Sequence, residues 1–168
     1  MRLPFLLALS LIAAPALAAT QAPRVGIASF DQLAQPLPLP YDEHADADAR
    51  VAAAKARARA SGKLLLIDLG GNWCPDCRML AGTIERPEVR SWVARYYEVV
   101  TVDIGRFDKN GQTAAHYGIP GRLEGVPAML VVNPRTDKLL NAGHVSALSD
   151  ARHMSPQALA DWLASWVS

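Results

Sequence analysis

The only two cysteines of this 168-residue chain, Cys74 and Cys77, are separated by two residues. A disulfide between residues so close in sequence closes a very small loop and stabilises little, so a structural role is disfavoured. A structural zinc site would need two further thiolate or imidazole ligands, and the four histidines do not cluster at ligand spacing. A C-x-x-C pair that follows an apolar run, here residues 63–69, is instead typical of dithiol–disulfide exchange.

The residues between the cysteines predict how the pair works. Pro75 favours a helix that begins directly after Cys74, where unpaired backbone N–H groups stabilise a thiolate. We therefore expect Cys74 to attack a disulfide sulfur and Cys77 to be the resolving thiol. Pro75 would stiffen the turn, and Asp76 would add a negative charge that disfavours the thiolate and keeps the pair from being an extreme oxidant. Alternatively, Asp76 is a solvated acid at the helix start with no effect on redox chemistry.

Strand and helix patterns alternate around the cysteine pair. Buried strands are predicted at 63–69, 99–103 and 126–132, and a strand at 138–141 pairs with the last of these after a turn at 133–136. Helices are predicted at 44–61, 75–84 and 110–117, with two more beginning at Pro87 and Ser155, and a brief strand is possible at 25–28. This order predicts an α/β fold, a mixed central sheet with helices on both faces.

The first 18 residues have the pattern of a signal peptide. Arg2 is the only charged residue before Arg24, and the apolar run 3–11 is too short to span a bilayer. Small residues at 16 and 18 predict cleavage after Ala18, and an uncleaved, membrane-anchored form is the alternative. Export to the periplasm suits the cysteine pair, because a C-x-x-C pair can persist oxidised outside the cytosol.

The remainder of the chain is predicted to form an extended arm followed by one domain. Residues 19–43 form the predicted arm, which is rich in proline and glutamine, and residues 44–168 form the domain. Removal of the leader takes away one base and no acid, which leaves 16 basic and 16 acidic residues. This balance does not indicate a nucleic-acid partner.

Four features of the chain resemble the thioredoxin superfamily. Residues 73–77 match its Trp-Cys-x-x-Cys motif, and Asp68 stands where thioredoxins carry a buried acid. Val126–Pro127 opens a strand, similar to the family's cis-proline loop, and the order of elements agrees from about 62 to 140. The resemblance implies a thioredoxin fold without a bound cofactor.

The resemblance also implies roles for individual residues. Asp68 would exchange protons with Cys77 as the mixed disulfide is resolved; alternatively it pairs with a lysine or turns outward. Pro127 would be cis and would present the backbone of Val126 to an extended substrate. Trp73 would cover the active site or have a plain packing role. The residues expected to contact the substrate are Trp73, Pro75, Asp76, Val126 and Pro127.

Other residues narrow the resemblance within the superfamily. Thr83 and the run 87–89 are more like exported thioredoxin-like domains, such as the C-terminal domain of the bacterial transmembrane disulfide reductase. Gly82 stands where ordinary thioredoxins place a kinking proline. The loop 120–125 is longer than in thioredoxin, and the family predicts that it borders the active site, so substrate preference stays open.

The sequence therefore predicts a monomeric, periplasmic thiol–disulfide oxidoreductase that acts on protein disulfides or dithiols. A membrane or soluble redox partner would recycle it. A reductant is the first expectation, and an oxidase or isomerase is the second. A metallochaperone or a redox-inactive adaptor of the same fold is the alternative from another class. No metal, cofactor or nucleic acid is expected.

Overall fold

A four-stranded mixed sheet lies at the centre of the computed structural model, which describes residues 20–167 of the chain. The predicted signal peptide lies outside the described residues. The strands, in the spatial order β2-β1-β3-β4, are β2 (Tyr97–Asp103), β1 (Leu64–Gly70), β3 (Ala128–Asn133) and β4 (Lys138–Leu139). β1 pairs with β2 in parallel and with β3 antiparallel, and β3 and β4 are antiparallel.

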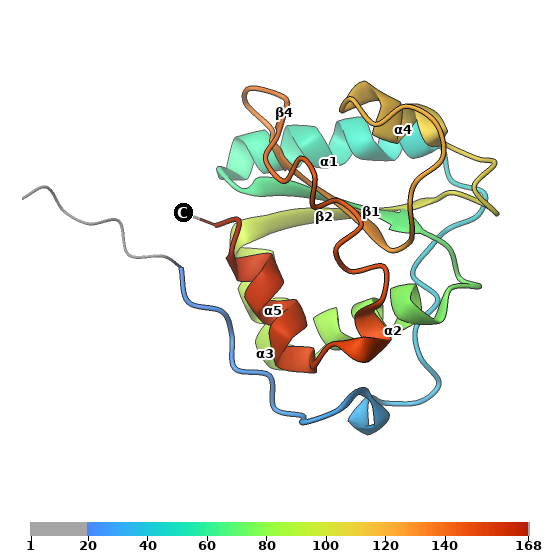
Figure 1. Cartoon of the computed structure of the whole chain (residues 1–168). Coiled ribbons are helices and arrows are strands. Elements are labelled where there is room, and N and C mark those ends of the chain that lie inside the picture. Colours follow the sequence, from blue (N-terminus) through green and yellow to red (C-terminus); the bar gives the residue numbers. More distant parts are fainter. Residues whose placement is uncertain (1–19, 168) are drawn as a thin grey trace, which may run out of the picture.

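Helices cover both faces of this sheet (Figure 1). One face carries α1 (Ala47–Ser61) and α4 (Gly111–His116), and the other carries α2 (Pro75–Ile84), α3 (Pro87–Tyr96) and α5 (Pro156–Ala164). Two short 3-10 helices, η1 (Phe30–Gln32) and η2 (Ala151–His153), lie in the connecting segments. This arrangement confirms the predicted α/β sheet with helices on both faces.

The alternation of side chains along β1 divides the core into two layers. Leu65, Ile67 and Leu69 are buried with the alanines of α1, whereas Leu66 is buried with apolar residues of α2, α3 and α5. A strand that is buried on both faces needs apolar residues at almost every position, which explains the continuous apolar run. Asp68 has the same parity as Leu66, so it points into the α2 layer, toward the cysteine pair.

Local signals position the helix ends close to where the sequence predicted them, although α1 begins at Ala47 and not at the predicted residue 44. The Asp46 carboxylate accepts a hydrogen bond from the Ala49 N–H at 3.0 Å and caps α1, which ends at Gly62 with a φ of 71°. The Ser155 hydroxyl accepts from the Ala158 N–H at 3.1 Å and caps α5. These caps satisfy backbone groups that a helix end leaves without a partner.

The brief strand suggested at 25–28 is absent, and that prediction is wrong. The Val25 N–H donates to the side chain of Gln157 on α5, and the Gly26 N–H donates to the side chain of Glu88 on α3, both at 3.0 Å. Side chains of two helices thus take the hydrogen bonds that a neighbouring strand would have taken. Alternation of residue types over four positions could not reveal this.

The last two strands differ from the prediction in length. β4 contains two residues instead of the predicted 138–141, because the Asn141 side chain takes over the hydrogen bonding to β3. Its amide accepts from the Val131 N–H at 2.9 Å and donates to the Met129 carbonyl at 2.7 Å. β3 begins at Ala128, so Val126 and Pro127 lie in the preceding loop and not in the strand.

The arm, of which the structure describes residues 20–43, contacts the domain at several points. In Figure 1 it runs along the outside of the layer formed by α2, α3 and α5 and then continues to the start of α1. Val25, Leu33 and Tyr41 are buried, and Arg78 of α2 donates to the carbonyls of Leu37 and Pro38 at 2.8 and 3.1 Å. The arm therefore contributes buried residues to the fold.

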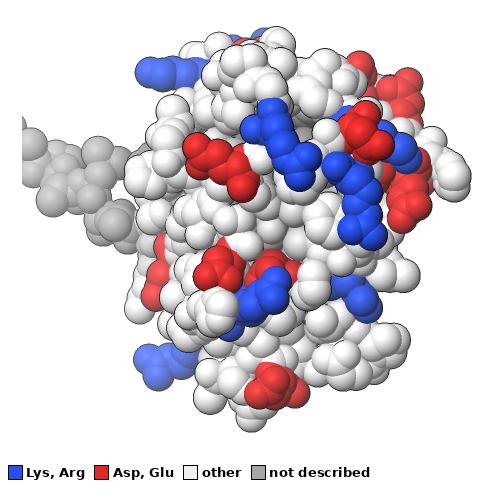
Figure 2. Space-filling model, turned by 45° about the vertical axis from the view of Figure 1, so that its right-hand side comes forward, with Lys and Arg blue, Asp and Glu red and all other residues white. Residues whose placement is uncertain are grey.

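Acidic and basic side chains are interspersed on the surface that Figure 2 shows, without a block of either sign. This distribution agrees with the near balance of acids and bases in the whole chain. Within residues 20–167, no helix combines the length and the apolar character needed to cross a membrane.

Candidate active site

Cys74 and Cys77 lie at the N-terminus of α2 and are joined by a disulfide, with their Cα atoms 5.3 Å apart. Cys74 is the N-cap residue, and its Sγ accepts a hydrogen bond from the Cys77 N–H at 3.1 Å. Pro75 occupies the first helical position. After reduction, this N–H and the helix dipole would stabilise a negative charge on the Cys74 sulfur. Cys74 is 3% exposed and Cys77 is fully buried, so Cys74 is the more accessible of the two.

The loop that precedes β3 faces Cys74. The Val126–Pro127 peptide bond is cis, as the resemblance implies. The Val126 carbonyl oxygen lies 3.5 Å from Cys74 Sγ, although the two residues are 52 positions apart in sequence. The backbone of Val126 is therefore beside the sulfur, where an extended substrate segment would approach.

Asp68 of β1 is buried and forms a hydrogen bond with the arm. Its side chain is 3% exposed, and the Tyr41 hydroxyl donates to its Oδ1 at 2.8 Å. The two alternative interpretations, an outward-facing acid or a lysine pair, are wrong, because Asp68 is buried and its hydrogen-bond partner is a tyrosine. Burial raises the pKa of Asp68 to about 7, and the Tyr41 hydrogen bond opposes this rise.

Asp76, between the two cysteines, is buried and paired with an arginine. It is 3% exposed, and its Oδ1 accepts from the backbone N–H of Arg152 in η2 at 2.8 Å. The Arg152 Nε lies 3.2 and 3.1 Å from the two carboxylate oxygens, and its Nη2 also bonds Oδ2. The prediction of a solvated acid is wrong. The other interpretation was that Asp76 places a negative charge beside the thiolate. It did not take account of Arg152, whose positive charge opposes that of Asp76.

Trp73 lies beside the disulfide on the surface and is held by three contacts. Its side chain is 37% exposed, and its Nε1 donates to the Gly105 carbonyl at 2.6 Å. The Phe107 ring lies 5.9 Å away, and the Arg106 guanidinium is 4.7 Å from the centre of the indole. Phe107 has a φ of 69°, which is uncommon for a bulky residue. Trp73 is therefore packed on one side and open to solvent on the other.

Comparisons with known proteins agree with this geometry. A family model described as thioredoxin-like matches residues 46–134. The chain belongs to this thioredoxin-like family. Among solved structures, it is similar to the crystal structure of a disulphide isomerase from Xylella fastidiosa Temecula1, with 39% sequence identity and a TM-score of 0.70. The match covers 76% of this chain and 96% of that one. A comparison with curated protein sequences finds no match.

The family match and the solved relative confirm the thioredoxin fold and the predicted superfamily. A thioredoxin-like domain with a C-x-x-C disulfide at a helix N-terminus also supports the predicted enzyme class, a thiol–disulfide oxidoreductase. The chemistry of such enzymes needs two thiols that can form and break one disulfide, and Cys74 and Cys77 meet this requirement.

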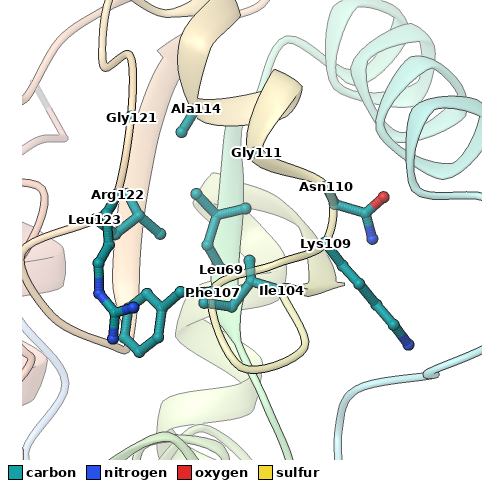
Figure 3. Close-up of a pocket in the computed structure, with 10 residues that line it drawn as sticks. All are labelled: Leu69, Ile104, Phe107, Lys109, Asn110, Gly111, Ala114, Gly121, Arg122 and Leu123. Atoms are coloured by element: carbon teal, nitrogen blue, oxygen red, sulfur yellow. The ribbon is translucent and has the colours of Figure 1, made fainter.

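In this thioredoxin-like domain the loop at 120–125 reaches Trp73 through Phe107. The Arg122 guanidinium lies 4.0 Å from the centre of the Phe107 ring, whose other neighbour is Trp73. A small cavity of about 30 Å³ lies beside Phe107 and Arg122. Figure 3 shows the residues that line it. Leu69, Phe107 and Leu123 are among its lining residues. This volume is about that of one water molecule.

Two histidines of the thioredoxin-like domain contact carboxylates. His116 Nε2 is 2.9 Å from an Asp137 carboxylate oxygen, and His153 Nδ1 is 2.7 Å from an Asp150 oxygen. In the part of the chain that the structure describes, no group of three or more His, Cys, Asp or Glu residues could hold a metal ion.

Sequence reasoning missed two residues that contact the predicted site. Tyr41 is 27 residues from Asp68, and Arg152 is 76 residues from Asp76. The arm has no periodic pattern, and a single arginine before a helix carries no spacing signal. Only the tertiary structure brings these side chains to the acids.

Asp68→Asn should make the stability of the protein less sensitive to pH. The folded pKa of Asp68, about 7, lies above its ordinary value of 3.8. The stability that this group contributes is therefore fully present below about pH 4 and is lost as the pH rises through about 7. Because asparagine does not ionise, the variant should gain stability relative to wild type between these limits.

Urea denaturation at a series of pH values measures this gain. Asp31→Asn, which alters an exposed acid of η1, is the control and should follow wild type. Stability curves of wild type and Asp68→Asn that stay parallel from pH 4 to pH 8 would contradict the prediction.

Proposed function

We propose that the chain is a periplasmic reductant of protein disulfides that acts as a monomer through Cys74 and Cys77. The observation that carries this proposal is the position of the cysteine pair. It lies at a helix N-terminus, with the cis-Pro127 loop on one side, and Asp68 is buried in β1. Trp73, Pro75 and Val126 would then border the bound substrate.

The proposed reaction begins with the reduced pair. The Cys74 thiolate attacks one sulfur of a substrate disulfide, forms a mixed disulfide and displaces the other substrate sulfur as a thiolate. Cys77 then loses its proton to the Asp68 carboxylate and attacks the Cys74 sulfur. The Cys74–Cys77 disulfide forms and the second substrate thiolate leaves, so two electrons have passed from the enzyme to the substrate.

The buried acid supports the direction of electron flow. An isomerase needs a mixed disulfide that persists long enough for the substrate to rearrange, whereas a reductant needs rapid attack by the second thiol. A carboxyl group with a pKa of about 7 can take a proton from Cys77 near neutral pH, which shortens the life of the mixed disulfide. This favours a reductant.

Isomerisation is the second candidate, and the solved relative is the observation that favours it. That protein is described as a disulphide isomerase, and its sequence is 39% identical over most of its length. An isomerase would cycle through the same first step but would leave the substrate with a rearranged disulfide. Product analysis with a scrambled disulfide protein separates the two activities.

Location and recycling complete the proposal. The leader pattern of residues 1–18 supports export, and fractionation of cells followed by N-terminal sequencing tests it. A periplasmic enzyme that begins at Ala19 is the expected result. A reductant that releases its electrons to substrate needs a membrane or soluble donor to reduce the Cys74–Cys77 disulfide again.

The reduction potential of the Cys74–Cys77 pair is the decisive measurement. We expect a value near that of thioredoxin, about −270 mV, in equilibrium with a dithiothreitol series and read by Trp73 fluorescence. A value near −120 mV would mean an oxidant and would overturn the proposed direction. A pair that does not cycle, with retained copper or zinc, would favour the metallochaperone; a pair that does not cycle and binds no metal would favour the adaptor.

A further inference from the structure

The arm brings a tyrosine to the buried acid of the active site. The Tyr41 side chain is buried, and its hydroxyl donates a hydrogen bond to Asp68 Oδ1 at 2.8 Å. Burial and the Asp68 carboxylate both raise the pKa of Tyr41 well above its usual range. The phenol therefore keeps its proton and remains a hydrogen-bond donor to Asp68 when that carboxylate is ionised.

Two hydrogen bonds lock Tyr41 to the segment that carries the cysteines. Its N–H donates to the Asn72 Oδ1 at 3.1 Å, and its carbonyl accepts from the Asn72 Nδ2 at 2.8 Å. Asn72 precedes Trp73 and Cys74 directly. The position of the Tyr41 backbone is thus tied to the loop that begins the active-site helix, and its hydroxyl is tied to β1.

Gly70 shows how close Tyr41 also is to the resolving cysteine. A methyl group at Gly70 would lie 2.4 Å from the Tyr41 hydroxyl oxygen and 2.8 Å from Cys77 Sγ. The Tyr41 hydroxyl oxygen and Cys77 Sγ therefore both lie close to Gly70. Asp68 is two residues before Gly70 in β1, so its side chain points to the same face of the sheet. Tyr41, Asp68 and Cys77 surround one small volume that only a glycine leaves open.

We propose that Tyr41 is a positioning residue for the resolving step, holding the Asp68 carboxylate in place to receive the proton of Cys77. This inference rests on the proposed function, since it assigns a role within the same reaction. The arm then contributes to the resolving step, because it carries Tyr41, the side chain that orients Asp68.

The groups around Asp68 determine the direction in which loss of the Tyr41 hydroxyl would shift the pKa of Asp68. Asp68 pairs with Thr101 of β2 and Met129 of β3, both uncharged, and α2 contributes Cys77. Beyond Tyr41 lies Asp103, whose Oδ2 is 3.6 Å from Lys109 Nζ. A hydroxyl that donates to a carboxylate favours its charged form, so loss of the hydroxyl should make Asp68 accept its proton at a higher pH.

Tyr41→Phe tests the proposal, with oxidised glutathione as the probe disulfide. The reduced enzyme reacts with the probe, is quenched with acid at intervals, and is analysed by mass spectrometry for the mixed disulfide and the closed disulfide. The pH midpoint for decay of the mixed disulfide should rise by about one unit, since a hydrogen bond to a charged group has about this effect. Formation of the mixed disulfide should change less than about twofold, because the phenol donates to Asp68, whereas Cys74 Sγ accepts from the Cys77 N–H.

Tyr97→Phe is the matched control. Tyr97 is also a buried tyrosine, but its hydroxyl donates to the Leu163 carbonyl at 2.7 Å, within the other core layer. It should leave the pH midpoint of decay at the wild-type value. In an Asp68→Asn background, Tyr41→Phe should have no further effect on the rate of decay.

The outcomes separate this inference from the proposed function. If Asp68→Asn slows decay but Tyr41→Phe leaves the midpoint unmoved, Tyr41 is only a packing residue and the inference is overturned. If wild type forms neither the mixed disulfide nor the closed Cys74–Cys77 disulfide with the probe, the proposed function itself fails. If Tyr41→Phe does not fold, Asn72→Ala releases the Tyr41 backbone instead; it should move the midpoint in the same direction, and an unmoved midpoint overturns the inference.

Discussion

Replacement of Cys74 by serine should abolish disulfide exchange, with a loss of at least about 10³-fold in rate, as expected when an essential nucleophile is removed. The alcohol that remains is not ionised at neutral pH, so neither the Cys77 N–H nor the dipole of α2 can produce a nucleophilic anion at this position. Reduction of a protein disulfide, followed by the turbidity of the released insulin B chain, measures the loss.

Cys77→Ser is the paired variant and should behave differently. Cys74 stays at the N-cap position and can still attack a disulfide, but no second thiol is available to release the substrate. The mixed disulfide should therefore accumulate as a covalent complex, visible on a non-reducing gel and lost with dithiothreitol. Accumulation in Cys74→Ser instead would reverse the assigned roles of the two cysteines.

Replacement of Arg152 by methionine should both destabilise the protein and make its dithiol more reducing. Methionine keeps much of the apolar stem of arginine but leaves the buried Asp76 carboxylate without its guanidinium partner. The Arg152 side chain is half exposed, so water would replace part of the lost bonding, and we expect the free energy of unfolding to fall below that of wild type.

The redox effect of the same change has a definite sign. An Asp76 carboxylate without a partner would disfavour the neighbouring Cys74 thiolate and so the reduced state. The reduction potential should become more negative, by roughly 30 mV, which corresponds to about 1.4 kcal/mol. Urea denaturation and a dithiothreitol redox series measure the two effects separately.

The double variant Asp76→Asn with Arg152→Met is the control for both measurements. It removes the two charges together, so it should recover most of the stability and most of the potential that Arg152→Met loses. A potential that stays at the wild-type value in Arg152→Met would show that the Asp76 charge does not act on Cys74. The original prediction, that Asp76 sets the redox poise, would then be wrong.

Short-range signals were enough to predict the order of the elements and the reactive pair. Pro75 directly after Cys74 predicts a helix that begins at the cysteine, and the structure begins α2 there. The apolar run 63–69 predicts a strand buried on both faces, which β1 confirms with a shift of one residue. Each signal lies within a few residues of the element that it predicts, so no knowledge of distant contacts was needed.

Predictions were wrong where a distant side chain replaced a local partner. The region 25–28 lacks a strand because Gln157 and Glu88 bond its backbone, and β4 is short because the Asn141 side chain bonds β3. Such contacts depend on where helices settle against the sheet, which composition and alternation over four residues do not encode.

The sequence by itself determined the reactive chemistry of this protein: two thiols at a spacing that closes one disulfide, at the start of a helix that stabilises a thiolate. Only the tertiary structure decided the charges around that pair. It pairs Asp76 with Arg152 from the segment before α5, and it bonds Asp68 to Tyr41 from the arm. The physical reason is that a spacing within one helix turn follows from local geometry, whereas the partner of a buried charge is selected by packing of the whole chain.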